Sequence, residues 1–162
     1  MEYFVLFFCL AITLHNIEEA IWLPEWSKGA SKFHKAVTPN EFYFAVIVIT
    51  SLAYLSSFYY LIFPQSDIVK WVFTGFLGSM IFNTIFPHLL LTIIMRKYAP
   101  GLATGILLNI PINSSIIQYM LANDMLSIKE LIISTAVVGA VLLSLIPVLF
   151  KIGGRISPVS KL

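Results

Sequence analysis

Five long apolar stretches constrain the fold of this chain more than any other feature of its sequence. They cover residues 3–23, 42–63, 68–95, 102–121 and 131–150. Crossing the hydrocarbon core of a bilayer takes about 20 apolar residues in a helix, and each stretch is about that long. Only 11% of the 162 residues are charged, against about 25% in a soluble domain. The sequence predicts an all-α integral membrane bundle of about five transmembrane helices, forming one domain over residues 1–162.

Helix-start and turn signals separate these stretches. Segment 38–41 combines an N-cap threonine, a first-turn proline and a capping-box glutamate, and segment 127–130 repeats the capping box. Further turn signals occur at 64–67 and 98–101. Both capping boxes precede an apolar stretch, as expected where a helix starts.

The distribution of lysine and arginine predicts the orientation of the bundle. With the N-terminus outside, the inner side would receive eight basic residues and the outer side two. The inner ones are Lys28, Lys32, Lys35, Arg96, Lys97, Lys151, Arg155 and Lys161, and the outer ones are Lys70 and Lys129. Because cytoplasmic loops carry an excess of such residues, we expect a cytoplasmic C-terminus in a multi-pass protein of the plasma membrane. A cleaved signal peptide is not expected, because the chain starts without a basic region.

The longest connection, residues 23–37, is expected to follow the cytoplasmic membrane interface. Trp26 would lie at the depth of the lipid headgroups, with the lysines of the segment facing anionic lipid. His34 is expected to be a solvated loop residue.

The first span carries ionisable residues that need a partner. Residues three and four positions after His15 share its side of a helix, so one face gathers His15, Glu18 and Glu19. A charged residue at the centre of a transmembrane helix costs about 2.5–3.5 kcal/mol. The simpler alternative is that the glutamates reach water at the interface, since Trp22 and Pro24 follow. That alternative does not explain His15, which lies a turn deeper.

The third span offers a partner at the same depth. His15 and His88 each lie about eight residues from the cytoplasmic end of their spans, roughly 12 Å inside. Pro87 cannot donate to the carbonyl of Asn83, so the helix must kink or widen there. A π-like bulge would bring Asn83 and His88 onto one side. We expect the two histidines to face each other, although a histidine beside a proline can also be a packing residue.

The start of the fourth span enters the same layer of the membrane. Thr104 and Asn109 of this span are expected to donate hydrogen bonds to the ionisable cluster, together with Asn83 and the turn residue Tyr98. Tyr43, at the start of the second span, is a further candidate.

These motifs, in this order, resemble those of the HXXEE-domain family of small multi-pass membrane proteins. The resemblance rests on His15, Glu18 and Glu19, then on Asn83 with His88, then on the turn 98–101 with Thr104. It covers the chain from the first span into the fourth. It implies a membrane protein whose biochemical activity is unassigned.

The residue types of the cluster favour a metal-dependent membrane enzyme, most simply a hydrolase. His15, Glu19 and His88 would supply three ligands to Zn²⁺, leaving the open position that catalytic zinc uses for water. Glu18 would be the general base, by analogy with the H-x-x-E-H motif, in which the histidines bind metal and the glutamate is the base. Here Glu19 stands in place of the second histidine. The ligand spacing of ferritin-like sites would exchange the roles of the two glutamates.

Two other functions stay open on the sequence alone. Glu18, Glu19 and His88 could form a proton or ion relay of a transporter, although the outer halves of the spans lack charged groups for a continuous path. The cluster could instead hold helices together in a non-catalytic accessory subunit.

The expected partners follow from the depth of the cluster and from the charge of the chain. The substrate would be a lipid or an amphipathic small molecule reached from the cytoplasmic leaflet, and a homo-oligomer is left open. A net charge of +2 with scattered basic residues excludes a nucleic-acid surface.

Overall fold

The fold is that of a computed structural model, which describes residues 2–30 and 36–156. The described residues form helices joined by turns, with no strand among them. In chain order the helical segments are α1 (Glu2–Gly29), α2 (Pro39–Ile62), α3 (Asp67–Asn83), the π-helical η1 (Thr84–Leu89), α4 (Leu90–Met95), α5 (Leu102–Thr104), the π-helical η2 (Gly105–Asn109), α6 (Ile110–Ala122) and α7 (Ile128–Gly153). Followed through η1 and η2, they make five helical passes long and apolar enough to cross a membrane. The predicted all-α fold, with five helices long and apolar enough to span a membrane, is confirmed.

Both predicted capping boxes begin a helical pass. At the start of α2, Thr38 N donates to Glu41 Oε2 at 2.7 Å while the Thr38 side chain accepts from Glu41 N. At the start of α7, Ser127 N donates to Glu130 Oε2 at 2.8 Å and the same reciprocal bond forms. Each pair satisfies backbone N–H groups that have no partner within the helix.

The first helix extends further than the sequence predicted. Helix α1 continues through Pro24 to Gly29, so the first part of the expected interfacial connection is helical. Ser27 stabilises this extension. Its Oγ donates to the carbonyl of Pro24 and accepts from the backbone N–H of Val37, which precedes α2 in the chain. His34 lies outside the described residues.

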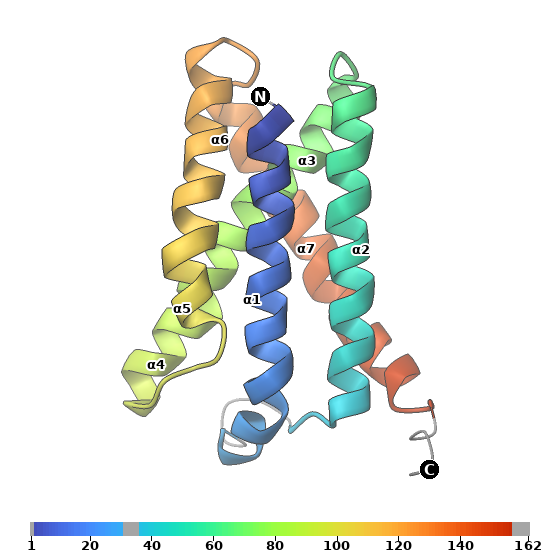
Figure 1. Ribbon diagram of the computed structural model, residues 1–162, viewed down its shortest axis with the longest axis vertical. Helices are drawn as coiled ribbons and strands as arrows, with labels where there is room; N and C mark the ends of the chain where they lie inside the picture. Colours follow the sequence, from blue (N-terminus) through green and yellow to red (C-terminus); the bar gives the residue numbers. More distant parts are fainter. Residues whose placement is uncertain (1, 31–35, 157–162) are drawn as a thin grey trace.

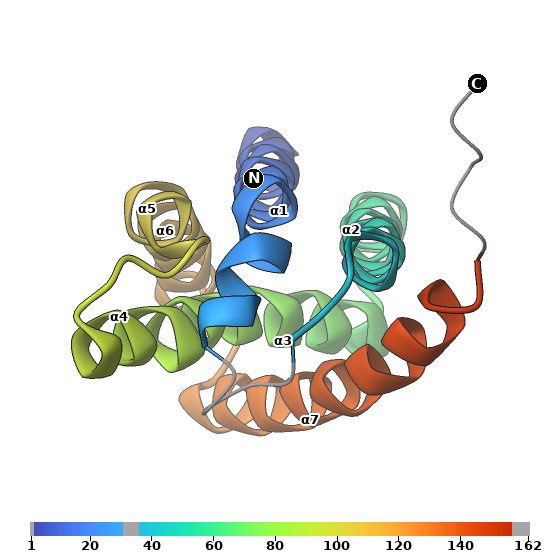
Figure 2. The ribbon, with the colours of Figure 1, turned by 90° about the horizontal axis from the view of Figure 1, so that it is seen from below.

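The passes are arranged in three layers (Figure 2). Helix α1 lies between α2 and the α5–α6 pass in the first layer, α3 and α4 form the middle layer, and α7 lies on the far side of α3. Two glycines allow α3 and α7 to approach closely, since a Cβ on Gly78 would lie 1.9 Å from Thr135 Oγ1 and one on Gly75 would lie 2.4 Å from Val138 Cγ2. Beyond this crossing, α4 and the end of α7 diverge toward the lower end of Figure 1.

The apolar core fills the end of the bundle where α1 and α3 begin. Phe8, Tyr60 and Phe73 are buried there, with the rings of Tyr60 and Phe73 stacked at a centroid distance of 4.6 Å. Phe8 meets Phe73 edge to face at 5.7 Å. The ionisable residues of the first and third passes lie beyond this core, toward the end where α4 and α7 diverge.

Two passes are interrupted next to each other. The third pass changes from α-helix to η1 after Asn83, and within η1 Phe86 has extended dihedral angles (φ −129°, ψ 112°) just before Pro87. The predicted break at Pro87 is confirmed. The fourth pass contains η2, which was not predicted from the sequence. Thr84 in η1 packs on Gly105 in η2, where a Cβ would lie 2.5 Å from Thr84 Cγ2.

Candidate functional site

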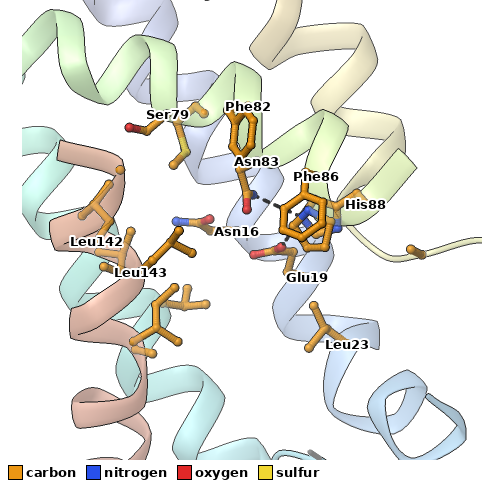
Figure 3. A pocket seen from close by; sticks show the side chains of 18 of the residues that line it. Asn16, Glu19, Leu23, Ser79, Phe82, Asn83, Phe86, His88, Leu142 and Leu143 are labelled. Atoms are coloured by element: carbon orange, nitrogen blue, oxygen red, sulfur yellow. Dashed lines mark hydrogen bonds and ion pairs between the residues drawn. The ribbon is translucent and has the colours of Figure 1, made fainter. Parts of the chain in front are cut away.

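His15, Glu19 and His88 converge beside the interruption of the third pass. His88 Nε2 lies 2.9 Å from Glu19 Oε1, and His15 Nε2 lies 3.7 Å from the same oxygen. The two imidazole rings meet edge to face with centroids 5.3 Å apart. The prediction that the two histidines face each other is confirmed. Figure 3 shows Glu19 and His88 paired at the edge of a cavity.

Asn83 bridges the two histidines. Its Nδ2 lies 3.2 Å from Nε2 of His15 and 3.2 Å from Nε2 of His88. The π-helical turn brings Asn83 and His88 onto one side although they are five residues apart, as predicted. Because an amide nitrogen only donates, Asn83 can donate to the unprotonated Nε2 of His15, whereas Nε2 of His88 lies 2.9 Å from Glu19 Oε1 and donates to that carboxylate. The amide can also turn its oxygen toward a cation.

The cluster of His15, Glu19 and His88 lies mostly out of contact with solvent, and none of the described lysines and arginines is paired with it. The three side chains are 0%, 12% and 5% exposed, respectively. Within the described part of the chain, no lysine or arginine forms an ion pair with Glu19. A buried carboxylate needs a compensating positive charge. Here an imidazolium or a bound cation can provide it.

Glu18 is held by the start of the fourth pass instead of by the cluster. Its Oε1 accepts hydrogen bonds from the Tyr98 hydroxyl and, at 2.8 Å, from Gly101 N. Its Oε2 accepts from Thr104 N at 2.9 Å and from Thr104 Oγ1 at 2.6 Å. A carboxylate is favourable beside unpaired N–H groups at a helix start. Burial and the contact with Glu18 raise the pKa of Tyr98, so its hydroxyl remains a donor at neutral pH.

Thr104 links Glu18 to His15. Its Oγ1 lies 2.6 Å from Glu18 Oε2 and 3.1 Å from His15 Nδ1. A hydroxyl has one proton and a carboxylate can only accept, so Thr104 donates to Glu18 and must accept from His15 Nδ1–H. In a neutral imidazole this leaves Nε2 unprotonated, with its lone pair available to the cluster. Thr104 was predicted as a donor to the ionisable residues, and it does donate to Glu18, while it accepts from His15.

The turn before the fourth pass covers the two imidazoles. Gly101 has a φ of 95°, and a Cβ there would lie 2.8 Å from His88 Cε1 and 3.0 Å from His15 Cε1. Glycine meets both demands, because it adopts positive φ without strain and has no side chain. The predicted turn therefore supplies both the Gly101 N–H for Glu18 and a close backbone cover for the cluster.

A cavity of about 940 Å³ opens beside the cluster, between α1, α2, the third pass and α7 (Figure 3). Its walls are mostly apolar, and its polar end includes Asn16, Glu19, Asn83 and His88. The lining also includes exposed side chains on the outer surface of the bundle, namely Phe82, Phe86, Ile132 and Leu143. Small-molecule pockets typically measure about 300–1,000 Å³, so this cavity is large enough for a ligand.

The other predicted residues lie apart from the cluster. Asn109 is buried, and within the described part of the chain neither of its amide atoms has a hydrogen-bond partner. Tyr43 is exposed on α2. The structure adds Asn16, whose Nδ2 donates to Thr50 Oγ1 at 2.6 Å. The depth of Asn16 in a span was a signal for a cavity or a partner, but no sequence pattern indicated Thr50.

Comparisons with known proteins agree with the motifs. A family model described as "Protein of unknown function with HXXEE motif" matches residues 6–116. The "Uncharacterized protein YrkK" of Bacillus subtilis (strain 168) is 67% identical over 158 residues, which cover 98% of this chain and 100% of that protein. No solved structure matches the chain. The matched family region contains every residue of the cluster and the turn that covers it.

Proposed function

The chain belongs to the HXXEE family, and we propose that it is a metal-dependent membrane hydrolase with one divalent ion, most simply zinc, at His15, Glu19 and His88. The convergence of their ligand atoms carries the proposal, since all lie within 4.8 Å of one another. Zinc bonds of about 2.0–2.1 Å place tetrahedral ligands about 3.4 Å apart. The distances of 2.9 and 3.7 Å from Glu19 Oε1 to the two Nε2 atoms lie on either side of that value. The residues therefore fit such an ion.

The donor set also fits hydrolytic chemistry. Two imidazoles and one carboxylate form a common catalytic zinc site, in which the ion polarises a carbonyl and makes water nucleophilic near neutral pH. His15 presents an unprotonated Nε2, because Thr104 and Glu18 keep the proton on Nδ1. The turn at Gly101 covers the imidazoles on one side.

Glu18 is better suited to positioning than to proton transfer. The base role expected for Glu18 stays a prediction, and the geometry does not favour it, because four donors occupy its two oxygens. We therefore assign Glu18 to orienting His15 through Thr104 and to anchoring the fourth pass. The remaining carboxylate at the site is Glu19.

We further propose that the site lies near the cytoplasmic face of the plasma membrane. The third pass ends beyond His88 at the basic pair Arg96 and Lys97, on the side that would receive eight of the ten basic residues. The substrate would be a lipid or amphipathic molecule that enters from the cytoplasmic leaflet past the exposed side chains of Phe82, Phe86 and Leu143.

Cysteine labelling tests this orientation. In a Cys9→Ser background, which removes the only native cysteine, a cysteine at Gln65 should react with a membrane-impermeant maleimide on intact cells. A cysteine at Lys97 should react only after permeabilisation, because positive residues stay in the cytoplasm. The reverse pattern would place the site in the outer leaflet.

Metal-dependent turnover tests the hydrolase assignment. The purified protein should hydrolyse a long-chain fluorogenic acyl substrate, and removal of metal by a chelator should lower the rate by about 100-fold or more, since a metal supplies several kcal/mol of transition-state stabilisation. Adding zinc back should restore the rate. A rate that persists after verified removal of all metal would refute the metal-dependent mechanism.

A further inference from the structure

The amide of Asn16 is fixed in one orientation at the polar end of the cavity. Thr50 Oγ1 donates its single proton to the carbonyl of Val46 at 2.7 Å. It can therefore only accept from Asn16, whose Nδ2 lies 2.6 Å away. Thr50 thus directs the nitrogen of Asn16 toward α2 and its Oδ1 the other way. Figure 3 shows this oxygen on the side of Asn16 nearer Glu19.

Asn16 Oδ1 accepts no hydrogen bond from the described residues. Within the described residues, the hydrogen bond to Thr50 is the only one made by the Asn16 side chain. Asn16 lines the cavity, and its oxygen is not among the enclosed atoms that lack a partner. The neighbouring side chain on the same helix face, Glu19, also presents acceptors. The acceptor oxygens of Asn16 and Glu19 on α1 therefore favour a ligand that carries hydrogen-bond donors.

The rest of the cavity suits an alkyl chain. Its apolar walls come from α2, α3 and α7 and include Val46, Ile49, Met80, Leu142, Leu143 and Ile146. Gly139 on α7 also lines this space, where a Cβ would lie 3.3 Å from Ser79 Oγ. A polar headgroup placed against these apolar walls would lose its hydration and find few hydrogen-bond partners.

We infer that the ligand is a single-chain secondary amide, an N-acyl amine. Its alkyl chain would occupy the apolar part of the cavity, its carbonyl would lie toward Glu19 and His88, and its N–H would donate to Asn16 Oδ1. The position of the carbonyl rests on the proposed function, whereas the N–H contact does not involve the metal. An ester has an oxygen in place of the N–H, so it would set a lone pair against Asn16 Oδ1. Sites built around a substrate N–H discriminate strongly against analogues that lack it.

The corresponding reaction is amide hydrolysis. A bond forms between the oxygen of water and the carbonyl carbon, the C–N bond breaks, and a proton from the water passes to the departing nitrogen. The products are a fatty acid and an amine. The inference therefore narrows the proposed hydrolase to an amidase acting on long-chain amides.

Photolabelling with matched probes tests the inference. Three probes would carry the same diazirine-bearing alkyl chain on a secondary amide, an N-methyl tertiary amide or an ester. With protein in phosphatidylcholine nanodiscs, the secondary amide should label the cavity walls at 79–91 and 131–150 about 10-fold more than either other probe, because a bound ester or tertiary amide would cover Asn16 Oδ1 without donating to it. The selectivity should appear in metal-free and zinc-loaded protein alike.

Two variants separate recognition from folding. Thr50→Val frees the Asn16 amide to turn, and Asn16→Leu removes the acceptor, so both should bring the labelling ratio close to one. Asn123→Leu, in the exposed turn after α6, should keep the wild-type ratio. Equal labelling by the three probes in the wild-type protein, or labelling outside the cavity, would overturn the inference. Because the ratio is measured without metal, its failure is distinguishable from failure of the metal site.

Discussion

Glutamine at position 19 should abolish zinc binding while the bundle stays folded. The change removes the negative charge of the only anionic ligand, whose Oε1 lies 2.9 Å from His88 Nε2 and 3.7 Å from His15 Nε2, and it replaces one carboxylate oxygen by an amide nitrogen, which does not bind zinc. The rise in Kd should exceed the 10- to 100-fold that loss of a supporting residue typically costs. Competition between the metal-free protein and a chromophoric chelator in detergent measures this Kd, and circular dichroism checks the fold.

A glutamate on the same helix provides the control. Glu25 is exposed and paired with Lys28, so Glu25→Gln should bind zinc as tightly as the wild-type protein. Wild-type affinity in Glu19→Gln would remove Glu19 from the ligands, whatever happened to the hydrolytic rate.

Valine at position 104 should weaken zinc binding by about 10- to 100-fold, the usual effect of losing a group that orients a ligating histidine. The Thr104 hydroxyl accepts from His15 Nδ1 because its own proton goes to Glu18. Valine keeps the shape but removes this link, so His15 can also carry its proton on Nε2, where it blocks the metal. Thr104→Ser keeps the hydroxyl and should retain most of the affinity.

The protonation state of His15 distinguishes this positioning role from a merely structural one. In the metal-free wild-type protein, ¹⁵N chemical shifts of the His15 ring should report a proton on Nδ1, and in Thr104→Val they should report a mixture of tautomers. A wild-type His15 protonated on Nε2 would contradict the link. An unchanged tautomer in the valine variant would contradict it equally.

The proximity of His15 and His88 could be predicted from the sequence, because the distance of a residue from the end of its apolar span indicates its level along the bundle. Counting residues from the span ends placed His15 and His88 at one level, and Pro87 indicated a break that brings Asn83 beside His88. In the structure the two imidazole rings lie in contact, the third pass is interrupted at Phe86 and Pro87, and Asn83 lies beside His88. These predictions succeed because helix rise and the missing N–H of proline are local properties of the sequence.

Which glutamate contacts the histidines and which contacts the fourth pass could not be derived in this way. Glu18 and Glu19 lie about 60° and 40° from His15 around a helix, so either could meet His88. The choice depends on the fourth pass, whose N–H groups and hydroxyls take Glu18 and leave Glu19 to the histidines. The hydrogen bond from Asn16 on α1 to Thr50 on α2 also joins two helices. The sequence pattern of a single helix does not predict such a contact.

The extent of the first helix was misjudged for a similar reason. Pro24 signals an interruption when its neighbours are unknown, yet the helix continues for another turn and a half to Gly29. Ser27 stabilises that extension through Pro24 and Val37. The unpredicted η2 likewise reflects packing, because Gly105 lies directly against Thr84 of the third pass.

Elemental analysis of the protein, purified in detergent without added metal or chelator, tests the central claim most directly. The proposed site predicts about one divalent ion per chain in the wild-type protein, zinc above all, and a near-complete loss of that ion in His88→Ala, where one of the three ligands is missing. The same two samples should have indistinguishable helix content. A wild-type protein that carries no stoichiometric metal, and acquires none when zinc is supplied, would contradict the account.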